Sequence, residues 1–222
     1  MSLLIAAVVA FGFGQTLEAR LIHPPTPRPT ILYVHIALFA AWVVLFISQT
    51  LFVRIGQANW HRRLGIFGIA VGAAMPLVGM ATALTMTRLN AGRGSIAVED
   101  QAFLALSFFD MLAFTAFLLA AVGYRKRPEY HRRLMLIATC GLTVAAFARF
   151  PSGLLPDNTW YLGVDALILT GVVRDLLVEG RVHPVYAFGL PAVMLGQSVT
   201  MWAYLTRVPA WLMLARILLR AP

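Results

Sequence analysis

ILYVHIALFAAWVVLFISQTLFV, residues 31–53, is a long apolar run broken only by single polar residues. It exceeds the roughly 20 residues that an α-helix needs to cross about 30 Å of hydrocarbon. Strand-like alternation is absent from it, so each backbone group would be hydrogen-bonded within one helix, as a lipid environment requires. The run therefore predicts a membrane-spanning helix.

Five further apolar runs of similar length follow, at residues 64–87, 102–123, 134–155, 160–178 and 184–206. Hydrophobic residues make up 60% of the chain and charged residues 12%, whereas soluble domains have about 45–50% and 25%. These features exclude an ordinary soluble domain. They predict an all-α, polytopic transmembrane helix bundle with a six-helix core over residues 31–206, within a single integral membrane domain, 1–222.

The two ends of the chain add elements to this core. Residues 1–17 begin with a short apolar run, but neither the basic segment nor the A-x-A cleavage site of a signal peptide accompanies it. We therefore expect a retained N-terminal helix, which gives the bundle about seven helices. The prolines of 22–30 predict an extended connector. At the other end, 209–220 predicts an interfacial amphipathic helix with Trp211, Leu214 and Leu218 on one face.

The basic residues predict the orientation. Ten of the eighteen lie in three short loops, 54–63, 124–133 and 174–183, so we expect these loops to be cytoplasmic and the protein to lie in a bacterial inner membrane. The expected partners are the lipid bilayer and other membrane subunits. Nucleic acid is excluded, because no basic face interleaved with aromatic side chains is present.

Single residues exclude several cofactor chemistries. Cys140 is the only cysteine, which rules out a disulfide, an iron–sulfur cluster or a thiolate zinc site within one chain. Lys126 is the only lysine and lies in a loop, which rules out a retinal Schiff base inside the bundle.

One motif occurs twice, as WHRRLG at 60–65 and YHRRLM at 130–135. Superposing the copies aligns two helical hairpins and predicts a parallel repeat. The first interpretation is a membrane anchor, with the aromatic ring at headgroup depth and arginines among lipid phosphates. The alternative is that His61 and His131 ligate the iron of one haem b, with the neighbouring arginines pairing with its propionates. Two histidines alone would hold a bare metal ion weakly.

Four polar residues fall at similar depth in the opposite half of the bilayer: His35, Asp110, Arg149 and Asp165. A charge at this depth is costly unless it is paired, so we expect one connected cluster with Arg149 at its centre. Two interpretations stay open, an ion-pair network that ties helices together and a pocket for a ligand, metal or proton. His35 is also a candidate haem ligand.

A resemblance supports part of this selection. FGFGQT (11–16), VHIALFAAWVVLFISQT (34–50), HRRLG (61–65), FFDMLAF (108–114) and HRRLMLIAT followed by ARFP (131–151) resemble a family of uncharacterised bacterial multi-spanning membrane proteins with HRxxG-type motifs, a domain-of-unknown-function group. The likeness covers about 11–151 and implies no activity. It matches His35, Trp42, Gln49, His61, Arg62, Asp110, His131, Arg133 and Arg149.

A shorter likeness concerns HRRLG alone. It is similar to the helix starts of cytochrome b561-like and haem-A-synthase-like proteins, where such a histidine ligates haem. Those proteins place paired histidines deep in their helices, whereas only His35 is deep here.

Two classes of function follow from the sequence. The first is a redox or ligand-binding membrane protein with haem b or a buried His/Asp/Arg site. The alternative is a non-catalytic accessory subunit of a respiratory, photosynthetic or transport complex. No catalytic residue, substrate or reaction is indicated.

Overall fold

The computed structural model describes residues 1–24, 27–92 and 94–220, and within them the regular secondary structure is all helix, with no strand. The helices are α1 (Ser2–Gly14), the π-helix η1 (Glu18–Ile22), α2 (Thr30–Arg54), α3 (Ala58–Ala91), α4 (Val98–Gly123), α5 (Pro128–Gly141), α6 (Val144–Phe147), α7 (Trp160–Glu179), α8 (Pro184–Thr206) and α9 (Pro209–Arg220). The predicted all-α class is confirmed.

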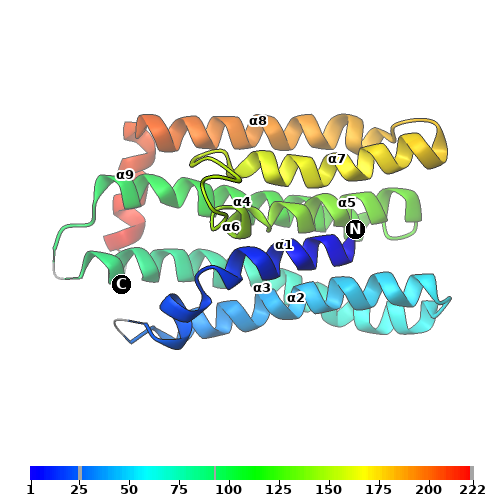
Figure 1. The fold of residues 1–222 in the computed structure, drawn as a ribbon, viewed down its shortest axis with the longest axis horizontal. Helices are drawn as coiled ribbons and strands as arrows, with labels where there is room; N and C mark the ends of the chain where they lie inside the picture. The colour runs from blue at the N-terminus through cyan, green and yellow to red at the C-terminus, as the bar shows by residue number, and fades with distance from the viewer. Residues whose placement is uncertain (25–26, 93, 221–222) are drawn as a thin grey trace.

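The long helices lie side by side along the molecule's longest axis (Figure 1). The α2–α3, α4–α5 and α7–α8 connections, which hold the three basic loops, lie together at one end, on the right of the view. The α3–α4 connection lies at the other end. Three helices, α2, α3 and α4, are long and apolar enough to cross a membrane, and α1 is a shorter apolar helix.

The predicted span 134–155 is wrong. Helix α5 ends at Gly141, and only the single turn α6 follows before an irregular segment reaches α7. The Thr143 hydroxyl donates to the Cys140 carbonyl oxygen at 2.6 Å, an alternative to continuing the helical ladder. Pro151 and Pro156 further oppose a helix in this segment.

Helix α1 packs against the place where that span is interrupted. Gly12 lies so close to the Ala146 backbone of α6 that a β-carbon would overlap its carbonyl oxygen. Ile5 is 1% exposed and belongs to the main core, with Val144 and Phe147 of the α6 region. A half-length N-terminal helix therefore shields the shortened second hairpin.

The α1 region otherwise follows the prediction in part. The α-helix ends at Gly14, and the expected continuation toward residue 17 becomes a turn that leads into η1. The predicted connector 22–30 includes residues 25–26, which lie outside the described part of the chain.

Helix α9 has the predicted bounds and crosses the ends of α3 and α4 (Figure 1). Ala215 and Leu219 are buried against Leu104 of α4, and the Trp211 Nε1 donates to a backbone oxygen at 3.0 Å. Leu214 is 46% exposed. The packed face is thus rotated from the predicted one, because Ala215 and Leu219 pack against α4.

Candidate functional site

The two motif histidines meet at the end of the bundle that carries the basic loops. His61 lies in the first turn of α3 and His131 in the first turn of α5. Their ring centroids are 6.3 Å apart, with an interplanar angle of 84°. The sequence predicted equal depth, and the structure adds that the two rings are neighbours. Both imidazoles are half-buried.

A backbone contact fixes the tautomer of His131. Its Nδ1 lies 2.8 Å from the Ala121 carbonyl oxygen at the end of α4. Because a carbonyl oxygen only accepts, Nδ1 carries the proton and Nε2 keeps its lone pair. Metal-ligating histidines have this arrangement, with one ring nitrogen held by a carbonyl and the other on the metal.

Two polar atoms beside the pair have no hydrogen-bond partner within the described chain. They are the His61 Nδ1 and the Gln49 Nε2, and both are buried. Gln49 lies near the end of α2 and approaches the start of α3 at Gly65. Since buried polar atoms are normally satisfied, these two mark a place where a polar or metal partner would be accommodated.

The second motif also carries an ion cluster that sequence reasoning missed. Arg133 is 1% exposed; its Nε donates to Asp175 of α7 at 2.6 Å and its NH2 nitrogen to the same carboxylate at 2.9 Å. Further bonds reach Glu129 at 2.6 Å and Glu179 at 2.7 Å. This bidentate arrangement is the strong form of an arginine–carboxylate pair.

The cluster has an electrostatic effect at its exposed rim. The hydrogen bond from Arg133 holds the pKa of the Glu129 carboxyl below its usual value. The sequence did contain a signal, since Asp175 and Glu179 are four residues apart and so share a helix face. That signal was overlooked because Arg133 was expected among lipid headgroups.

The first motif has different surroundings. Trp60 is 56% exposed and stacks on Phe52 at 6.4 Å, and the Arg63 guanidinium lies 5.9 Å from the Trp60 ring centroid. Arg62 and Arg63 are both exposed. Among the described residues, the arginines of this copy are thus exposed rather than paired with acids, and the interfacial anchor stays a prediction.

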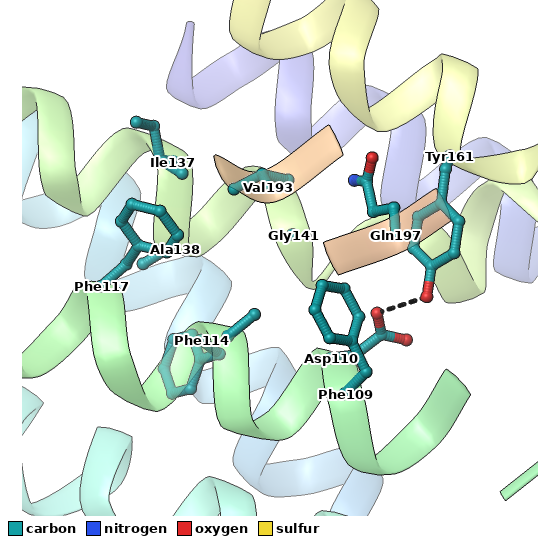
Figure 2. A pocket seen from close by; sticks show the side chains of 11 residues that line it. Phe109, Asp110, Phe114, Phe117, Ile137, Ala138, Gly141, Tyr161, Val193 and Gln197 are labelled. Carbon is teal, nitrogen blue, oxygen red and sulfur yellow. Dashed lines mark hydrogen bonds between the residues drawn. The ribbon is translucent and has the colours of Figure 1, made fainter. Parts of the chain in front are cut away.

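Asp110 lies midway along α4, in a separate site shown in Figure 2. The Tyr161 hydroxyl of α7 donates to its Oδ1 at 2.9 Å. Both residues line a cavity of about 10 Å³, room for a single water. The remaining wall is mostly apolar, from Phe109, Phe114, Phe117, Ile137 and Val193.

Asp165 has its own partner. In the orientation of the Gln197 amide that satisfies both groups, the nitrogen donates to the two Asp165 oxygens at 3.0 and 3.3 Å. Gln197 also lines the cavity beside Asp110 (Figure 2). The cavity is therefore lined by the Asp110–Tyr161 pair and by Gln197, whose amide links it to Asp165 outside the lining.

Arg149 is not the hub that the sequence suggested. Among the described residues, no ion pair joins it to Asp110 or Asp165. Its guanidinium lies 4.4 Å from the Phe13 ring of α1 and donates to the Ala145 carbonyl oxygen. The physical reason is the early end of α5, which carries Arg149 out of a spanning helix.

His35 lies on α2, stacked on Phe39 with ring centroids 4.1 Å apart. Its Nδ1 is buried without a hydrogen-bond partner in the described structure. The Arg149 guanidinium lies close enough to the His35 ring to interact with it electrostatically. The four predicted residues thus divide: Asp110 lines the cavity, Asp165 reaches it only through Gln197, and Arg149 lies against Phe13 of α1 and acts on His35.

Comparison with known proteins gives no further constraint. No protein-family model, curated protein or solved structure matches the chain. The class of protein is therefore defined by the fold itself, an all-helical chain with three helices able to cross a membrane. Within the described residues, no group of three or more His, Cys, Asp or Glu side chains is placed to hold a metal ion.

Proposed function

We propose that this chain is a polytopic protein of the bacterial inner membrane, with about seven membrane helices, that binds one haem b between His61 and His131. The function would be electron transfer at the membrane face that holds the basic loops. The proposal rests on one observation, that the imidazole rings of His61 and His131 are neighbours.

The distance between the rings supports a shared metal. Imidazole nitrogens bind metal ions at about 2.0–2.1 Å, and the ring centroids of His61 and His131 are 6.3 Å apart, a separation short enough for one ion to be shared by a nitrogen of each ring. The Ala121 carbonyl oxygen would keep Nε2 of His131 available as a ligand. The unpartnered polar atoms of His61 and Gln49 fit the same place.

The number of ligands favours haem over a bare ion. A structural zinc site takes four protein ligands and a catalytic one takes three, and no such group is present among the described side chains. Haem iron brings four nitrogens of its own and needs only axial ligands from the protein. Two imidazoles complete that set.

The surrounding residues suit the edge of a haem. The exposed arginines Arg62 and Arg63 follow His61 directly, and guanidinium groups bind carboxylates such as propionates. Arg132 is already paired with Glu179 and Glu129, so the first motif would supply these contacts. When bound, the haem would supply one-electron redox chemistry, and His61 and His131 would hold it and exclude other ligands from the iron.

Absorption spectroscopy of the purified protein tests the proposal. We expect a Soret band at one haem per chain, lost in His61→Ala and in His131→Ala but retained in His23→Ala, which serves as the control. Loss of the band only in His35→Ala would move the site to α2 and contradict the proposal. A wild-type protein supplied with haem that shows no Soret band would favour the accessory-subunit alternative instead.

A further inference from the structure

A second cavity lies at the opposite end of α3 and α4 from the histidine pair. It encloses about 310 Å³ between the last turns of α3 and the first turns of α4. Its position on α3 is near Asn90, about 40 Å along the helix from His61 at 1.5 Å per residue. The cavity is therefore independent of the proposed haem site.

The cavity is polar at one end and mixed further in. Asn90 and Asp100 lie near the helix ends that flank the α3–α4 connection. Ala83 and Ser107 lie seven residues further in on each helix, a depth of about 10 Å. Met86, Phe103 and Leu104 supply apolar wall between them, so a ligand would place a polar head outward and an apolar body inward.

Asp100 supplies the one formal charge of the cavity wall among the described residues. Among the described residues, no hydrogen bond or ion pair involves the Asp100 carboxylate. The adjacent Glu99 differs, since it lies 4.0 Å from the Arg207 guanidinium. Both acids belong to the first turn of α4, where the helix dipole favours a negative charge.

We propose that this cavity binds a primary ammonium group on a short alkyl body, with the ammonium on Asp100 and Asn90 and the alkyl part against Met86, Phe103 and Leu104. A volume of about 310 Å³ is at the lower end of the range for ligand pockets. A cation is the charge that complements an unpaired carboxylate at a helix start. The ammonium would come from a free amine or from an aminophospholipid headgroup.

Butylamine binding to the protein in phosphatidylglycerol nanodiscs, measured by ligand-observed NMR and corrected for empty nanodiscs, tests the proposal. We expect saturable binding that is weakened about tenfold or more by Asp100→Asn, the loss of a charge-assisted hydrogen bond. The neighbouring Glu99→Gln should change it less than about twofold, since Glu99 does not line the cavity. Butanol, which lacks the charge, should bind at least about tenfold more weakly.

A cavity-filling variant keeps the test independent of charge. Ala83→Phe should abolish butylamine binding while leaving the circular dichroism spectrum unchanged. If butylamine binds more weakly in phosphatidylethanolamine nanodiscs, the lipid headgroup competes for the cavity and is the natural ammonium. If its affinity is the same in both lipids, the natural ligand is a free amine. Equal butylamine affinity in wild-type protein, Asp100→Asn and Ala83→Phe would overturn the proposal.

Discussion

The two copies of the aromatic-His-Arg-Arg motif have nearly the same sequence and very different surroundings. In the second copy, Arg133 is 1% exposed and bonded to three acids. In the first copy, Arg63 is exposed beside an exposed Trp60. The difference comes from α7, which covers α5 and supplies Asp175 and Glu179. The same aromatic-His-Arg-Arg pattern is thus exposed in one place and contributes a buried ion cluster in the other.

Removing the arginine from each copy should have the largest and most unequal effect. We expect Arg133→Leu to lower the free energy of unfolding by about 3–5 kcal/mol, because it removes the buried, bidentate partner of the Asp175 carboxylate and leaves only the exposed Arg174, at 3.3 Å, as a counter-charge. Arg63→Leu should cost less than about 1 kcal/mol, the usual range for exposed charges. Denaturation of the purified protein in detergent measures both.

A double variant separates ion pairing from packing. In Arg133→Leu combined with Asp175→Leu, part of the lost stability should return, because both buried charges are then removed together. Purely additive losses in the double-mutant cycle would show that the pair is not coupled. Equal losses in Arg133→Leu and Arg63→Leu would contradict the comparison itself.

Replacing the aromatic residue of each copy should change the stability by smaller amounts, again unequal between the two copies. Tyr130 stacks on Tyr124 at 5.1 Å and meets the His183 ring edge-on at 4.6 Å. We expect Tyr130→Leu to cost about 1 kcal/mol through the loss of these ring contacts. Trp60→Leu should change the stability in detergent less and should mainly weaken partitioning at the membrane interface. Thermal midpoints in detergent and in nanodiscs distinguish the two effects.

The smallest effect concerns pH and a histidine that packs beside the second copy, His183. Burial, together with the Arg133 charge, lowers the pKa of His183 below its ordinary value. The unfolded chain then binds a proton near its ordinary pKa, about 6.5, before the folded chain does. Stability should therefore fall as the pH drops from about 7 toward 5.

His183→Asn provides the matched control for the pH effect. The His183 Nδ1 accepts a hydrogen bond from the Val185 amide at the start of α8, and an asparagine oxygen can accept the same bond. The variant should keep the thermal midpoint at neutral pH and lose part of the decline on acidification. The Glu129 contribution would be lost only near the ordinary pKa of a glutamate, about 4.3, so it does not obscure the test. An unchanged acid decline in His183→Asn would assign the effect to other groups.

The helices could be predicted from the sequence where apolar length alone decides, as in α2, α3 and α4. Residues 134–155 misled because they are mostly apolar, while the end of α5 depends on Thr143 and on the packing of α1 against α6. The motif predicted that His61 and His131 share a depth, but not that their rings are neighbours. The partners of Asp110 and Asp165 were missed because Tyr161 and Gln197 carry no charge to match.

Carbon monoxide binding to the dithionite-reduced protein tests the shared-haem proposal most directly. With His61 and His131 both on the iron, the reduced wild-type spectrum should not change when carbon monoxide is added. The His61→Gly variant, supplied with haem and imidazole, should regain the wild-type spectrum, and removal of the imidazole should open the iron to carbon monoxide. A wild-type Soret band that shifts at once with carbon monoxide, or a His61→Gly spectrum indifferent to imidazole, would contradict ligation by this pair.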